Sequence, residues 1–273
     1  ATPKVSRATP TPIVTPFPRT QLERIFRKYS QKTSTQLGIV VMRGTERAGV
    51  GEDRSYEAAS LIKLPILAEY LAQVGEGRLR GDATMNFEER FRVGGSGKIK
   101  HGPVGKGYPL ATLAEVMITE SDNVATDMLL EKLGLETIEK RARSLGLRHT
   151  TVRRKIMDFA AIDKGRDNLT TPADMATLLG LWQNGRLPGS QEALRILNKQ
   201  KRNDVMTALL PREVAVAHKT GQLTGFLHDA GIVFAPTGGY IMVVMSQGGD
   251  ADLGKLGAEV FQVMNLQSGP AAH

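Results

Sequence analysis

The sequence contains no cysteine among its 273 residues, which excludes disulfides, thiol catalysis and cysteine-based metal sites. Its five histidines are scattered, with no H-x-x-x-H or similar spacing, so we expect no metal ion and no cofactor. Aromatic residues make up only 5% of the chain, which leaves little for nucleic-acid bases to stack on. No hydrophobic run approaches the roughly 18 residues of a membrane-spanning helix. Metalloenzymes, nucleic-acid binders and integral membrane proteins are therefore disfavoured.

The remaining composition is ordinary for a soluble globular chain, with 41% hydrophobic and 23% charged residues. The net charge of +8 is spread without a long basic stripe, which fits a polyanionic neighbourhood such as a cell envelope better than a nucleic-acid partner. Residues 1–18 are rich in proline and threonine and predict a tether. Such a tether suits the mature form of an extracytoplasmic protein whose export signal has been removed.

Residues 19–273 are predicted to form a single folded domain that opens with a helix. Thr20 and Glu23 have capping-box spacing, and a second capping box is predicted at Thr112 and Glu115. The apolar residues at helical spacing in the first helix are Leu22, Ile25, Phe26 and Tyr29. Period-two patterns predict strands at 36–43, 47–51, 214–219, 227–234 and 240–245.

These elements predict an α+β fold in which N- and C-terminal helices flank a five-stranded antiparallel sheet. A mainly helical lobe, about residues 59–204, is inserted into a sheet lobe formed by about 19–58 and 205–273. Helix starts are expected at Thr171-Pro172 in the inserted lobe and at Asp252 near the end of the chain. We expect a monomer with its site where the two lobes meet, since clefts between lobes commonly hold ligands.

The stretch ASLIKLPIL, residues 59–67, places Ser60 and Lys63 three residues apart within an apolar run. Residues at this spacing share one face of a helix. One interpretation is structural, with Ser60 capping the helix and Lys63 reaching past its edge to water. The other is chemical, with Ser60 as a nucleophile beside a desolvated lysine that can act as its base.

Two further motifs favour the chemical interpretation. Ser121-Asp122-Asn123 lies at a boundary between two helical segments, and Lys219-Thr220-Gly221 ends the first strand after the inserted lobe. With S-x-x-K, SDN and KTG in this order, the chain resembles the class A serine β-lactamases and their penicillin-binding relatives. The resemblance extends over nearly the whole folded part, through SDNVATDMLL, NLTTPADM and HKTG.

The resemblance implies a role for each motif residue. Ser60 would be acylated by a β-lactam or a D-Ala-D-Ala-like peptide, Lys63 would take its proton, and Ser121 would relay a proton to the leaving nitrogen. The residues implied to bind substrate are Asn123, Lys219, Thr220 and Gly221. The backbone N–H groups of Ser60 and Gln222 would form the oxyanion hole.

The chain departs from the family pattern in the loop at residues 151–172. Class A β-lactamases use a glutamate in an Ω-shaped loop to activate the deacylating water, and this segment contains none. Counting back from Pro172 places Lys155 at that position, and Asp158 is the best carboxylate candidate for the base. Asp158 could instead cap a helix or pair with Arg153 or Arg154, while Arg166 and Asp167 are expected to hold the loop together.

Two functions remain open from the sequence. The first is a serine hydrolase that acts on β-lactams and deacylates slowly, or a D,D-peptidase or esterase on the same frame. The second is an acylatable penicillin-binding or sensor module without turnover. The loop at 151–172 is the feature that separates them.

Overall fold

The structure is a computed structural model that describes residues 16–31, 34–248 and 251–266. Most of the predicted tether therefore lies outside the described residues. Phe17 is already buried against the sheet-side core, so the folded part begins slightly before the predicted start at residue 19.

The predicted five-stranded antiparallel sheet is confirmed, with strand order β2-β1-β9-β8-β7. The chain turns between the first two strands at Gly44, whose φ of +59° suits glycine. The strand bounds are β1 (Gln36–Arg43), β2 (Glu46–Val50), β7 (Val216–Leu223), β8 (Phe226–Val233) and β9 (Tyr240–Gln247). Two small ribbons pair β3 (Tyr56–Glu57) with β6 (Leu169–Thr170), and β4 (Thr84–Asn86) with β5 (Gly107–Pro109).

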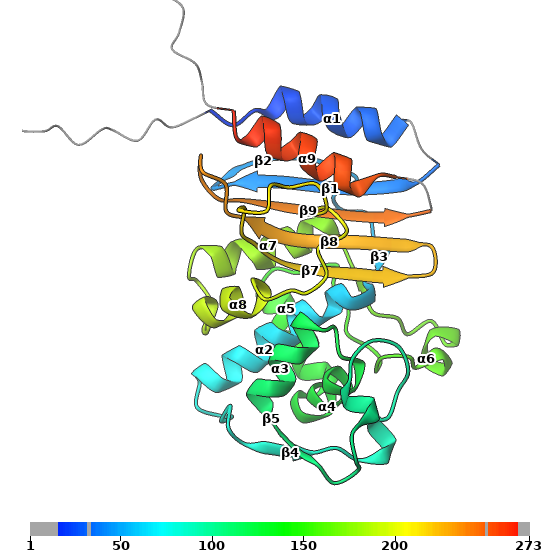
Figure 1. Ribbon diagram of the computed structural model, residues 1–273. Coiled ribbons are helices and arrows are strands. Elements are labelled where there is room, and N and C mark those ends of the chain that lie inside the picture. Colours follow the sequence, from blue (N-terminus) through cyan, green and yellow to red (C-terminus); the bar gives the residue numbers. More distant parts are fainter. Residues whose placement is uncertain (1–15, 32–33, 249–250, 267–273) are drawn as a thin grey trace, which may run out of the picture.

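Helices α1 (Arg19–Gln31) and α9 (Leu253–Met264) lie side by side against the sheet, at the top of Figure 1. The predicted apolar face of the first helix is confirmed, because Leu22, Ile25, Phe26 and Tyr29 are all buried. Asp252 caps α9 through a hydrogen bond from the Lys255 N–H. The capping box predicted at Thr20 is wrong, since α1 already begins at residue 19.

The inserted helical lobe packs on the opposite face of the sheet (Figure 1). Thr171 caps α7 and Pro172 is its first residue, as predicted. The capping box predicted at Thr112 is wrong, because Thr112 lies inside α3. The helix bounds are α2 (Lys63–Gly75), α3 (Leu110–Thr119), α4 (Asn123–Leu133), α5 (Leu135–Ser144), α6 (Phe159–Asp163), α7 (Pro172–Gln183) and α8 (Ser190–Leu197). Short 3₁₀ turns are η1 (Ala59–Ile62), η2 (Glu89–Phe91) and η3 (Ile99–His101).

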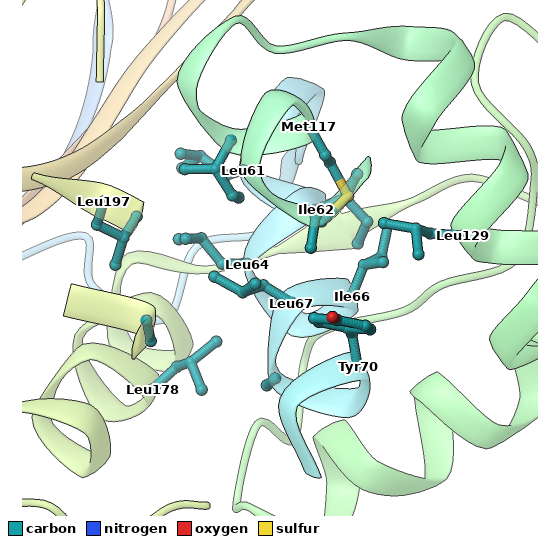
Figure 2. Close-up of a cluster of buried hydrophobic side chains, with 14 of the residues drawn as sticks. Leu61, Ile62, Leu64, Ile66, Leu67, Tyr70, Met117, Leu129, Leu178 and Leu197 are labelled. Carbon is teal, nitrogen blue, oxygen red and sulfur yellow. The ribbon is translucent and has the colours of Figure 1, made fainter. Parts of the chain in front are cut away.

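Helix α2 runs through the middle of this lobe and is apolar on nearly every side, as expected for a helix enclosed by others. Figure 2 shows Leu64 and Leu67 near Leu178 of α7, while Ile62 and Ile66 lie near Met117 and Leu129. The same core cluster includes sheet residues such as Val243, so it extends from one lobe into the other. This packing fixes the start of α2, where Ser60 and Lys63 lie, relative to the sheet.

Among the described residues, no helix has the length and apolar character that crossing a membrane requires. Over the same part of the chain, no group of three or more histidine, cysteine, aspartate or glutamate residues is arranged to hold a metal ion.

Candidate active site

Ser60 lies in the 3₁₀ turn η1, directly before α2, and its side chain is partly exposed. The preceding Ala59 has a φ of +45°, a left-handed conformation that is strained for a residue with a Cβ. Neither η1 nor α2 has a side-chain cap, so the capping interpretation of Ser60 is wrong. The turn instead presents the Ser60 hydroxyl to its polar neighbours.

Lys63 is completely buried, which rules out the interpretation in which it reaches past the helix edge to water. Its Nζ lies 3.2 Å from Ser60 Oγ and 3.0 Å from Ser121 Oγ. It also donates to Asn123 Oδ1 at 3.0 Å and to the Ser121 carbonyl at 2.7 Å. Lys63 and Ser121 are 58 residues apart in the chain. The Lys63 amine thus joins the S-x-x-K motif to the SDN motif.

Burial lowers the pKa of the Lys63 amine well below its usual range, and the nearby positive charge of Lys219 lowers it further. Asp122 and Asp127 act in the opposite direction, but their effect is smaller than that of burial. A lysine with a depressed pKa holds its own proton less tightly than an ordinary lysine. It can therefore accept the proton of the Ser60 hydroxyl.

Ser121 completes the hydroxyl pair, with its Oγ donating to Ser60 Oγ at 2.8 Å. It lies between α3 and α4 with a φ of +56°, and the contacts from Lys63 hold this strained conformation in place. Asp122 is structural: it caps α4 and accepts hydrogen bonds from the Lys98 and Ile99 amides. The motif thus brings the Ser121 hydroxyl into contact with Ser60 Oγ. Its Asp122 also anchors the loop that contains Lys98 and Ile99.

Lys219-Thr220-Gly221 lies inside β7 rather than at a strand end, because the strand continues to Leu223. Strand β7 is the edge of the sheet next to η1. A Cβ added at Gly221 would lie 3.3 Å from the Ser60 backbone nitrogen, so glycine permits this close approach. The neighbouring Gln222 lines the same cavities as Ser60, a placement compatible with the predicted oxyanion hole.

The family resemblance implies that Lys219 binds substrate, but the Lys219 side chain does not line the cleft. It is completely buried and donates to the Thr220 carbonyl at 2.8 Å. Burial lowers its pKa to about 7, although the charge of Asp229 opposes this shift. Thr220 does line the cleft, together with the half-buried Arg202, whose Nη1 donates to Gln222 Oε1 at 2.6 Å. Arg202 and Lys201 thus bring positive charge to the cleft on this side, and no motif pointed to them.

Ser60 lies where two cavities meet. The first, of about 720 Å³, is polar and contains Ser121, Thr220 and Arg202. The second, of about 360 Å³, contains Asn123 and apolar side chains of the loop that carries α6. Both cavities also share Ser96 and Gln222, so they form the two halves of one cleft centred on Ser60.

The loop at 151–172 is closed at its base by an ion pair between Arg154 Nε and Asp167 Oδ1 at 2.7 Å. The buried Asn168 strengthens this closure by accepting from the Arg153 amide and donating to the Arg154 carbonyl. The predicted role of Asp167 in holding the loop is thus observed, and its partner is Arg154. The closed loop brings Ile156, Met157, Phe159 and Ile162 to the edge of the cleft.

Ile156 of this loop lines the smaller half of the cleft, which also contains Ser60. Lys155 lines neither half of the cleft and pairs with Glu131 at 2.8 Å, and its correspondence to the glutamate of the family stays a prediction. Asp158 is exposed and its carboxylate accepts from the Ala161 amide at 3.0 Å as the cap of α6. It lines neither half of the cleft, and its role as the deacylating base stays a prediction.

Asp127 is a buried carboxylate that the motifs did not indicate. Its Oδ1 accepts from the Ile156 amide at 2.8 Å and so ties the loop to α4. Burial raises its pKa to about 6, partly offset by the Ile156 hydrogen bond and the charges of Lys155 and Lys63. In the sequence, only its position on a helix four residues after SDN marks Asp127. That position does not predict its contact with the loop, because the loop is distant along the chain.

The family model described as the β-lactamase enzyme family matches residues 18–264 of this chain. The chain belongs to the β-lactamase enzyme family. A β-lactamase of Bacillus licheniformis is 25% identical over 237 residues, which are 83% of this chain and 76% of that protein. The ROB-1 β-lactamase of Haemophilus influenzae is 29% identical over 203 residues, which are 71% of this chain and 65% of that protein.

Solved structures that are similar to this chain share its fold. The protein PBP-A superposes with a TM-score of 0.81 at 26% identity, covering 89% of this chain and 95% of that chain. A mutant of PBP-A has been solved as an acyl-enzyme complex with penicillin G. A β-lactamase from Sphaerobacter thermophilus superposes with a TM-score of 0.82 at 24% identity, covering 91% of this chain and 98% of that chain. These likenesses confirm the predicted family and fold.

Proposed function

We propose that this protein is a serine hydrolase that acts on β-lactams through a covalent acyl-enzyme and deacylates slowly. The observation that carries the proposal is the contact of Ser60 Oγ with Ser121 Oγ at 2.8 Å and with Lys63 Nζ at 3.2 Å. A buried amine of lowered pKa next to a hydroxyl in an open cleft is the arrangement that nucleophilic acyl transfer needs.

In the acylation step, the Ser60 Oγ–H proton passes to Lys63 Nζ as Oγ bonds to the β-lactam carbonyl carbon. The carbonyl oxygen becomes an oxyanion beside the Ser60 and Gln222 amides, which are proposed to stabilise it. The C–N bond then breaks, and a proton moves from Lys63 through Ser121 Oγ to the leaving nitrogen. Charge and protons balance, and no cofactor takes part.

Deacylation requires water and a base on the side of the acyl-enzyme that the loop covers. There the loop presents the apolar Ile156 and not a carboxylate. General-base catalysis contributes a factor of roughly 10²–10⁴, so its loss is expected to make hydrolysis of the acyl-enzyme the slow step. The same observation supports a second candidate, an acylatable penicillin-binding module or a D,D-peptidase that β-lactams block.

The test measures pre-steady-state and steady-state kinetics with a chromogenic β-lactam, together with intact-protein mass. We expect a burst near one equivalent, a mass adduct on Ser60, and slow turnover. Ser60→Ala should remove both burst and adduct, and an adduct that persists would refute the assignment. An adduct that never hydrolyses would assign the protein to the acylatable module.

Asp158 remains our proposed residual base, and two variants separate that role from helix capping. Asn can replace aspartate as a cap but not as a base, whereas Ala can do neither. If Asp158 is the base, Asp158→Asn and Asp158→Ala should slow turnover equally while the burst persists. Slower turnover in Asp158→Ala alone would show that Asp158 acts only as the cap of α6.

A further inference from the structure

His228 is a buried imidazole that the proposed acyl transfer leaves without a role. It lies on β8, and none of its surface is exposed. Its Nε2 lies 2.9 Å from the Glu57 carbonyl oxygen, and its Nδ1 lies 3.2 Å from the Ser246 backbone nitrogen. The rings of Tyr56 and Phe226 contact it edge-on, with centroid distances of 5.9 and 6.0 Å. These contacts fix the orientation of the imidazole.

The two hydrogen-bond partners determine which nitrogen of the ring carries the proton. The Ser246 N–H can only donate, so Nδ1 accepts, and the Glu57 carbonyl can only accept, so Nε2–H donates. Burial lowers the pKa of the His228 imidazole, although the hydrogen bond to Glu57 opposes this shift, so the ring is neutral at pH 7. His228 lines neither half of the cleft. It is therefore a fixed donor to Glu57 rather than an acid or a base in the reaction.

The Glu57 carbonyl belongs to the segment that leads to the nucleophile. Glu57 ends β3, and Ser60 follows in η1. Between them, the Ala58 N–H donates to the Asn168 carbonyl at 2.9 Å. His228 thus holds this segment from the sheet, while Asn168 holds it from the base of the loop that carries α6.

The chain after this segment is strained and passes close to the edge of the sheet. Ala59 has a φ of +45°, a conformation that persists only where its surroundings enforce it. A Cβ added at Gly221 of β7 would lie 3.3 Å from the Ser60 nitrogen. Gly221 is also the residue that pairs with His228 in the sheet. The imidazole therefore comes from the strand position next to the point where β7 approaches Ser60.

The proposed oxyanion hole depends on this approach, because one of its N–H groups belongs to Ser60 and the other to Gln222 of β7. Such donors stabilise an oxyanion only when they are held in position before the reaction. Resting on the proposed function, we infer that His228 is a positioning residue, whose Nε2–H bond to the Glu57 carbonyl holds the Ser60 amide in the oxyanion hole. Without this bond, the segment before Ser60 shifts, and acylation slows while the affinity for substrate changes little.

Three substitutions separate the two hydrogen bonds of the ring. His228→Gln places an amide N–H near the position of Nε2 and so keeps a donor for Glu57. His228→Asn reaches only as far as Nδ1 and keeps an acceptor for Ser246, and His228→Leu keeps neither. Stopped-flow measurements with a chromogenic β-lactam give the acylation rate constant and the dissociation constant of the non-covalent complex separately. Melting temperatures show how much stability each variant loses.

We expect His228→Gln to be acylated within about threefold of the wild-type rate, whereas His228→Asn and His228→Leu are acylated at least about tenfold more slowly, part of the factor of roughly 10²–10³ that an oxyanion-hole donor contributes. The dissociation constant should stay within about twofold of the wild-type value in every variant. His228→Gln and His228→Asn should lose similar stability, since each keeps one of the two bonds. Acylation that falls equally in these two variants, or in proportion to their melting temperatures, would overturn the positioning role.

Histidine nitrogen-15 NMR of the wild type provides a second test that needs no substituted protein. The His228 ring should be neutral at pH 7 with its proton on Nε2. A proton on Nδ1 would overturn the inference, because the donor to Glu57 would be absent. A wild-type Ser60 that the β-lactam does not acylate would refute the proposed function and this inference with it. Acylation of His228→Asn as fast as that of the wild type would refute only the role of His228.

Discussion

At the scale of single residues, the site depends on a buried amine whose charge is controlled by its neighbours. Lys219 lowers the pKa of Lys63 by charge, and only burial has a larger effect. Lys219→Met keeps the buried volume and removes the charge, so the pKa of Lys63 should rise. The acid limb of the acylation rate against pH should then move to higher pH, and the rate loss should be larger at pH 6 than at pH 8.

A stopped-flow pH profile with a chromogenic β-lactam checks this outcome. Lys255→Met is the control, because Lys255 lies on α9 and forms an ion pair with Asp252. A profile that keeps its acid limb while acylation falls equally at every pH would contradict the electrostatic role of Lys219.

Asp127 supplies a second prediction at this scale. Its folded-state pKa is raised from 3.8 to about 6, so the folded protein holds the proton more tightly than the unfolded chain. The stabilisation from this proton is present below about pH 4 and is lost as the pH rises through 6. Asp127→Asn keeps an acceptor for the Ile156 amide without a charge, and should raise the free energy of unfolding at pH 7 by roughly 1–3 kcal/mol.

Urea unfolding at pH 7 and pH 4 measures this effect. The gain of Asp127→Asn over the wild type should shrink at pH 4, where the wild-type carboxyl is protonated in the folded protein. Equal gains at both pH values, or a loss at pH 7, would show that the buried carboxylate does not destabilise the fold.

At the scale of elements, we propose that the loop from Arg154 to Asp167 makes hydrolysis of the acyl-enzyme slower than acylation. Ile156 lines the cavity beside Ser60, and its backbone is held by Asp127. Ile156→Glu should place a carboxylate next to the acyl-enzyme and raise the deacylation rate at least about tenfold, part of the factor expected of a general base. Ile162→Glu adds the same charge to the same cavity from α6 and should have a smaller effect.

Deacylation is followed by the loss of the mass adduct after excess β-lactam is removed. Equal acceleration by the two glutamates would indicate a general effect of charge rather than a positioned base. No acceleration by Ile156→Glu would mean that water does not reach the acyl carbonyl from this side.

At the scale of the whole molecule, we expect the helical lobe and the sheet lobe to unfold together. One core cluster joins α2 and α7 to sheet residues such as Val243 and Ile232. Leu178→Ala in α7 should lower the free energy of unfolding by about 2–5 kcal/mol in a single transition. Circular dichroism and fluorescent-penicillin labelling should follow the same melting curve. Two resolved transitions would show that the lobes unfold independently.

Local patterns in the sequence determined much of the fold. The apolar face of α1, the extent of β1, the start of α7 at Thr171-Pro172 and the five strands all follow from periodicity and turn chemistry. These features depend on neighbours within a few residues, so the sequence displays them directly. The two capping boxes failed because serine, threonine and glutamate also occur within helices, where the spacing has no capping function.

The sequence also determined which residues gather around Ser60, because S-x-x-K, SDN and KTG together identify a family of sites. Only the tertiary structure decided that Lys219 is buried, that Arg202 lines the cleft, and that Ile156 rather than Lys155 lines it from the loop. These outcomes depend on the closure of a long loop by Arg154 and Asp167 and on the approach of β7 to η1. Contacts between segments distant in the chain leave no periodic signal, so their side-chain directions emerge only when the lobes pack together.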